Sequence, residues 1–126
     1  MTRDPNQRLV ERLRSRFPAE AAQTDQWLRE RDWDPTADDV SLIWVEAFAD
    51  RTMEAIRRRD SEVVQSHTNF IAAAYRAEPE ALRTIVDVAY AENIMWDAGR
   101  DDKVWAWKFI AAEIRQLYEA MWGAPG

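Results

Sequence analysis

The chain has 126 residues, of which 47% are hydrophobic and 32% charged, and it contains no cysteine, one histidine and three glycines. These values are typical of one soluble globular domain (1–126), and they exclude disulfides and thiol chemistry. The net charge of −6 argues against nucleic-acid binding, and no apolar run approaches the roughly 18 residues of a membrane span.

The N-terminal third predicts two helices and a loop. Asp4 followed by Pro5 is a helix start, because Asp caps a first turn and proline fits its first position. An apolar stripe at helical spacing then continues to Pro18. A second helix is predicted from about 19 to 29. The segment 30–36 has no period and contains an Asp-Pro step, so it predicts the longest loop.

The remainder predicts two antiparallel pairs of helices. A third helix from about 36 to 59 precedes a fourth that begins near Asp60. A fifth is predicted between Pro79 and Gly99, with Trp96 on its inward side and the glycine as its left-handed stop. A sixth runs in one piece from about 101 to 122. We therefore predict an all-α fold, a single compact domain of about six helices arranged as stacked antiparallel αα-hairpins.

The third predicted helix is apolar on two sides. Trp44 and Phe48 belong to one broad face, whereas Leu42 and Met53 fall on roughly the opposite side. A helix of this kind is usually central and covered on both flanks. The alternative is that Leu42 and Met53 form a surface that meets a partner. The pattern leaves both interpretations open.

Acidic side chains are concentrated between Asp25 and Asp50, where eight acids stand against two arginines. This region alone accounts for the net charge of the chain. In the third predicted helix the acids recur at helical intervals, so they share one stripe and repel one another. The stripe consists of Asp39, Glu46, Asp50 and Glu54. It is either a solvated surface or a patch that meets a basic partner.

Seven tryptophans make the chain rich in residues suited to contact surfaces. Trp33 lies between two acids and either closes the core or anchors a basic partner. Trp105 and Trp107 are two positions apart and cannot share one core stripe. Trp105 therefore contacts a second surface, within the chain or on another chain. The predicted partner-binding residues are Asp32, Trp33, Asp34, Asp39, Leu42, Glu46, Asp50, Met53 and Glu54.

Residues suited to catalysis are scarce. His67 lies among apolar positions with no second ligand at helical spacing, so we expect a buried structural histidine. Glu46 and Asp50 are spaced like an acid–base pair, but solvated surface is the commoner role of such pairs. No glycine-rich phosphate loop occurs in the sequence. We predict a protein that is not an enzyme and needs no metal and no cofactor.

A set of positions between Trp44 and Trp96 carries a family resemblance. They are Phe48-Ala49-Asp50, Val63, Val64, Phe70-Ile71, Ile85, Val88, Tyr90 and Glu92. With these residues the chain resembles a family of small all-helical bacterial proteins of unknown function. Some members of that group look like immunity proteins, which are made beside secreted antibacterial toxins. The resemblance implies no catalytic residue.

The preferred functional hypothesis is a protein-binding inhibitor, most specifically an immunity protein that covers the basic active-site surface of a cognate toxin. Electrostatic attraction would speed that association. The alternative is a helical adaptor or regulatory module that self-associates, for example as a homodimer, through Trp105 and Trp122. A third hypothesis is a small-ligand-binding protein. Because Met1 to Val10 lack an apolar signal segment, we expect a cytoplasmic protein, with neither nucleic acid nor membrane as partner.

Overall fold

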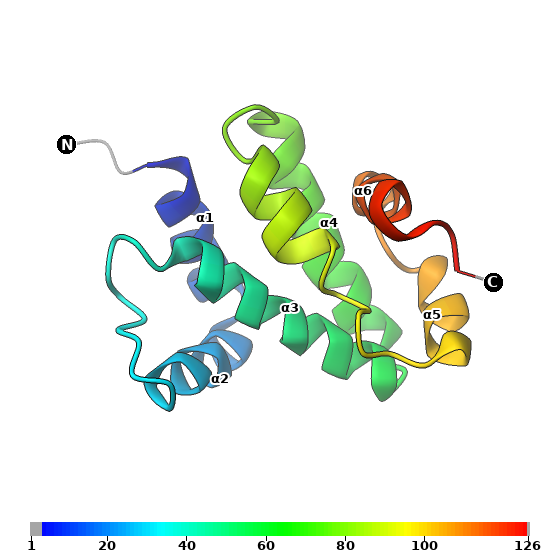
Figure 1. Cartoon of the computed structure of the whole chain (residues 1–126), viewed down its shortest axis with the longest axis horizontal. Helices are drawn as coiled ribbons and strands as arrows, with labels where there is room; N and C mark the ends of the chain where they lie inside the picture. Colours follow the sequence, from blue (N-terminus) through cyan, green and yellow to red (C-terminus); the bar gives the residue numbers. More distant parts are fainter. Residues whose placement is uncertain (1–3, 126) are drawn as a thin grey trace.

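The computed structural model describes residues 4–125, and all regular secondary structure in that part is helical (Figure 1). This confirms the predicted all-α fold, with seven helices in the described part rather than about six. They are α1 (Pro5–Arg16), α2 (Pro18–Arg29), α3 (Ser41–Arg57), α4 (Ser61–Ala77), the π-helix η1 (Ile85–Ala91), α5 (Arg100–Trp107) and α6 (Ala112–Trp122). None of the helices in this part is long and apolar enough to cross a membrane.

Helix α3 is the centre of the fold. It packs against α1, α2, α4, α5 and η1, and it lies in the middle of the view in Figure 1. Trp44 is fully buried and stacks on Phe48 with ring centroids 5.6 Å apart. Its indole N–H donates to Asp25 Oδ1 at 2.8 Å, which joins α3 to α2. The apolar pattern of this segment therefore reflects a central helix, as one of the two interpretations predicted.

The loop between α2 and α3 is longer than predicted and extends from 30 to 40. Asp32 adopts a left-handed backbone (φ 63°), and the N–H of Trp33 donates to the carbonyl of Leu28 at 3.0 Å. This bond ends α2 and turns the chain toward the side of α3. Residues 36–40 form turns because the Asp34 side chain accepts the N–H of Thr36 at 2.9 Å. Helix α3 consequently begins at position 41 rather than near 36.

The segment predicted as one helix from Pro79 to Gly99 has a different geometry. The centre of this segment is the π-helix η1, and turns lie on both sides of it. The N–H of Glu92 donates to the carbonyl of Asp87, five residues back, as is typical of a π-helix. The Asn93 amide donates to the carbonyls of Val88 and Ala89, both at 2.9 Å, and stabilises the end of η1. The glycine is no left-handed stop, since its φ of −69° and ψ of 162° are extended and it begins α5.

The predicted sixth helix is divided into α5 and α6. Ala111 is extended, with ψ 144°, and its N–H donates to Thr68 Oγ1 of α4 at 3.1 Å. This tertiary hydrogen bond replaces the helical one and redirects the chain. Ile110 and Ile114, on either side of Ala111, are buried, whereas Val104 remains 48% exposed. The core stripe of one uninterrupted helix therefore does not form.

Candidate protein-docking face

The predicted partner-binding residues, with one exception, reach the surface. Those on the loop and at the start of α3 are exposed, namely Asp32, Trp33, Asp34, Asp39 and Leu42. Farther along α3, Glu46 and Glu54 are exposed and Asp50 is half-buried. Met53 is only 5% exposed, so its inclusion was wrong. It lies on a side of α3 that the surrounding helices cover.

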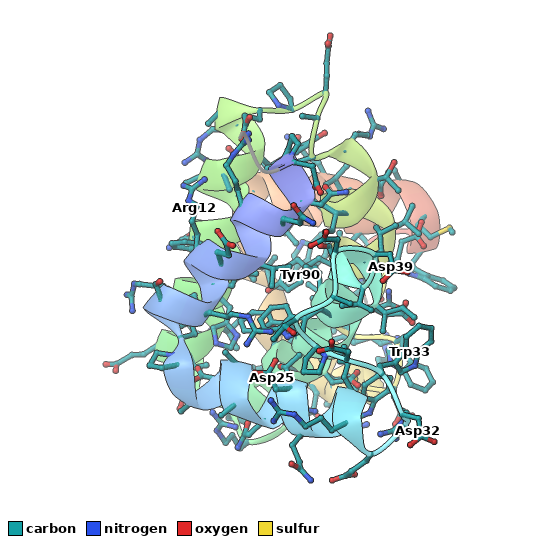
Figure 2. The ribbon with its side chains drawn as sticks, turned by 90° about the vertical axis from the view of Figure 1, so that its left-hand side faces the viewer. Arg12, Asp25, Asp32, Trp33, Asp39 and Tyr90 are labelled. Carbon is teal, nitrogen blue, oxygen red and sulfur yellow. The ribbon has the colours of Figure 1, made fainter. Side chains whose placement is uncertain are left out.

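We call the surface formed by Asp32, Trp33, Asp39, Leu42 and Glu46 the acidic face. In Figure 2 Asp32, Trp33 and Asp39 lie toward one side of the molecule, whereas Arg12 of α1 lies on the opposite side. Trp33 and Leu42 are each 43% exposed, so the face combines apolar contact area with carboxylates. The loop from 30 to 40 and the outer side of α3 build it together.

The carboxylates of the acidic face are not neutralised by the protein. Among residues 4–125, no basic group lies within 4.0 Å of the carboxylate of Asp32, Asp39 or Glu46. Glu54 differs, because Arg51 Nε is 3.0 Å from its Oε1. The basic residues at the end of α3 pair elsewhere, with Arg57 bonded to Asp97 at 2.6 Å. The negative charge of this face therefore projects into solvent.

Asp50 lies at the border of the acidic face beside an unexpected neighbour, Trp96. Burial raises the pKa of the Asp50 carboxyl, and this effect is opposed by the charge of Arg51 and by a hydrogen bond with the Trp96 side chain. The inward orientation predicted for Trp96 is wrong, because the residue is 59% exposed. The π-helix changes the angle between successive residues, so the α-helical period no longer predicts which side chains beyond it face the core.

Asp34 has a structural task in the loop. It accepts hydrogen bonds from the backbone N–H and the hydroxyl of Thr36, at 2.9 and 2.7 Å. These bonds lower the pKa of its carboxyl, the backbone bond having the larger effect. Asp34 therefore orders the segment that presents Trp33 and Asp39.

A buried polar chain is the arrangement closest to a catalytic site. His67 Nε2 is 2.9 Å from Glu20 Oε2, and His67 Nδ1 is 2.9 Å from Thr52 Oγ1. Carboxylate, imidazole and hydroxyl occur in the same order in hydrolase triads. Here Thr52 is fully buried and its oxygen lies 2.9 Å from the hydroxyl of Tyr90, so solvent does not reach the hydroxyl.

The predicted burial of His67 is confirmed, since its exposed fraction is 0%. Its ring packs against Phe17 and Phe48, with centroids 4.6 and 4.9 Å away. Burial lowers the pKa of His67, and the hydrogen bond and charge of Glu20 oppose that shift. The hydrogen-bond partners of His67 were not predicted, because Glu20 and Thr52 belong to two other helices, α2 and α3.

The tryptophans near the C-terminus differ in exposure. Trp105 is half-buried, with its ring centroid 4.9 Å from that of Phe109 and with Arg59 above it at 5.4 Å. Its second contact surface is therefore supplied by the same chain. Trp122 is 58% exposed and its indole N–H donates to the carbonyl of Glu92 at 3.0 Å. The surface available to the self-association hypothesis is thus centred on Trp122.

A family profile matches residues 10–123, and thus includes the acidic face and the buried polar chain. The chain belongs to that family, described as a domain of unknown function (DUF7674). This agrees with the resemblance to a family of unknown function. No curated protein and no solved structure matches the chain.

Proposed function

We propose that the protein is a protein-binding inhibitor, in its most specific form an immunity protein that covers the basic active-site surface of a cognate toxin. One observation carries the proposal: Asp32 and Asp39 lie on the same side of the molecule as the exposed Trp33 (Figure 2), and no basic group among residues 4–125 neutralises their carboxylates or that of Glu46, which is exposed on α3 like Leu42. Negative charge of this kind attracts a basic partner and speeds its approach. Tryptophan is among the residue types most enriched in binding hot spots.

The arrangement is difficult to explain by folding alone. On α3, Glu46 and Asp50 are four positions apart, and like charges at that spacing destabilise a helix by roughly 0.2–0.5 kcal/mol per pair. The chain contains enough arginine to neutralise the face, yet Arg57 and Arg59 pair with Asp97 and Asp102 instead. A partner with Lys and Arg around an apolar contact would neutralise the carboxylates and cover Trp33 together.

The experiment uses the double charge reversal Asp39→Lys/Glu46→Lys and a toxin encoded directly beside this protein. Association and dissociation rates are measured at low and high salt. We expect the double variant to associate about ten-fold more slowly at low salt, with a smaller difference at high salt. Asp50 is left intact, because a lysine there would disrupt the contact with Trp96.

The matched control reverses two exposed acids outside the acidic face, Glu62→Lys on α4 and Glu119→Lys on α6, and so changes the net charge equally. If the control slows association as much as Asp39→Lys/Glu46→Lys does, the effect comes from net charge. Normal binding by the double variant at both salt concentrations contradicts the proposal.

The alternative, an adaptor that self-associates, is favoured by the end of α6. Met121 and Trp122 are 52% and 58% exposed there, although both are large and apolar. Light scattering of the wild type and of Trp122→Glu tests this alternative. A dimer that Trp122→Glu converts to a monomer supports self-association, whereas a monomeric wild type contradicts it.

A further inference from the structure

A continuous chain of polar side chains crosses the core and joins four helices, in the order Glu20 on α2, His67 on α4, Thr52 on α3 and Tyr90 on η1. Each of the three contacts measures 2.9 Å. His67, Thr52 and Tyr90 are fully buried, whereas the Glu20 side chain is 25% exposed. Only the Glu20 end of the chain is therefore in contact with water.

With a neutral imidazole, one arrangement of protons satisfies every member of the chain. His67 Nε2–H donates to the Glu20 carboxylate, and Nδ1 accepts the hydroxyl proton of Thr52. The Thr52 oxygen in turn accepts from the Tyr90 hydroxyl. The Tyr90 hydroxyl remains protonated, because burial raises its pKa far above the usual value.

A second proton on His67 reverses this order. Nδ1–H must then donate to the Thr52 oxygen, so the Thr52 proton no longer has the imidazole as its acceptor. Only one of the two hydroxyl protons, that of Thr52 or that of Tyr90, can lie in the contact between them, so the other has no acceptor among residues 4–125. A buried polar group without a partner is strongly unfavourable. Protonation at one end of the chain thus destabilises Tyr90 and η1 at the other.

Several charged groups act on the imidazole. Burial disfavours its charged form most strongly, Glu20 from α2 favours it, and at the α3–α4 turn Arg58 disfavours it and Asp60 favours it. The rings of Phe17 and Phe48 cover its faces. A surface cavity of about 330 Å³ lies beside the imidazole and gives protons a route to Nε2. The residues that line it include Glu20, Glu62, Ser66 and His67.

We propose that this polar chain couples the protonation of His67 to the stability of η1. With neutral His67 every member of the chain is hydrogen-bonded, whereas protonated His67 leaves the contact between Thr52 and Tyr90 with an unpaired proton and so destabilises η1. A π-helix is a rare conformation that depends on such tertiary contacts. Tyr90 belongs to the seven residues of η1 and stands at the opposite end of the polar chain from Glu20. The proposal does not depend on the identity of any partner.

The test follows the ¹⁵N shifts of the His67 ring and the hydrogen exchange of backbone amides by NMR as the pH falls below 6.5, the ordinary pKa of histidine. Exchange is expressed as protection relative to the unfolded chain at the same pH. In the wild type we expect residues 85–91 to lose protection by roughly ten-fold as His67 titrates, while α1 keeps its protection.

Tyr90→Phe removes the one member of the polar chain that lies on η1, so η1 in this variant should keep its protection although His67 still titrates. Tyr118→Phe is the matched control, because Tyr118 is also buried but lies outside the polar chain. The control should behave like the wild type. Equal loss of protection in all three proteins, loss in α1 together with η1, or unchanged η1 protection in the wild type would each overturn the proposal.

Discussion

Replacement of Thr52 by valine removes one hydroxyl from the middle of the core and changes the shape of the side chain little. The substitution leaves His67 Nδ1 without a donor and the Tyr90 hydroxyl without an acceptor. Each buried group left without its partner costs about 1–3 kcal/mol. The added methyl group offsets about 0.8 kcal/mol through its burial. We therefore expect the free energy of unfolding to fall by about 3 kcal/mol.

The assay is urea denaturation at about pH 8, where a histidine is neutral. Thr24→Val is a matched control, because Thr24 is equally buried but its hydroxyl donates only to the carbonyl of Glu20 in its own helix, at 2.8 Å. That carbonyl belongs to the residue four positions earlier and already accepts the helical hydrogen bond of the backbone, so it keeps a partner without the hydroxyl. We therefore expect the control to lose less than about 1 kcal/mol.

A double variant identifies the source of the loss. Adding Tyr90→Phe to Thr52→Val removes the hydroxyl that has no acceptor, so the second substitution should restore about 1–2 kcal/mol. If Thr52→Val destabilises no more than Thr24→Val, or if Tyr90→Phe only adds to the loss, the hydrogen bonds of the polar chain do not stabilise the folded state.

Three further substitutions test separate parts of the structure. Asp50→Asn should raise the free energy of unfolding at neutral pH, because burial raises the carboxyl pKa in the folded state and so makes its ionisation unfavourable. In urea titrations this gain should shrink as the pH falls toward 3.8, the ordinary value of the carboxyl. Asp4→Ala should cost about 1 kcal/mol in the same assay, because its side chain accepts the N–H groups of Asn6 and Gln7 at the start of α1. Thr68→Val removes the acceptor for the Ala111 N–H, so hydrogen exchange at that amide should accelerate at least ten-fold.

Local sequence signals predicted α1 and α2 well, whereas the start of α3 was predicted five residues too early. Asp4 and Pro5 start α1 as expected, and the hydrogen bonds of this start are formed within the first turn. The later boundaries depend on contacts distant in sequence. The break before α6 requires Thr68, which is 43 positions from its partner Ala111. Hydrophobic periodicity contains no information on such a bond, so one uninterrupted helix was predicted there.

The exposure of the acidic side chains could be predicted only where it depends on local spacing. The spacing of the acids on α3 is a local property, and Glu46 is exposed as the stripe implies. Met53 and Trp96 were misplaced, because their exposure depends on the helices packed around α3 and on the π-helix. The partners of His67 lie 15 and 47 positions away in the sequence, and only the folded chain brings them together.

The central position of α3 would affect the energetics of docking on the acidic face. Leu42 and Glu46 stand on a helix that five other helices pack against, and the neighbouring Trp33 is held by its bond to the carbonyl of Leu28. A surface on such a scaffold loses little backbone entropy when a partner arrives, so more of its contact energy remains as affinity. The residues that the acidic face presents are thus ordered before any encounter, and a partner would need to adapt its own side chains rather than reshape this protein.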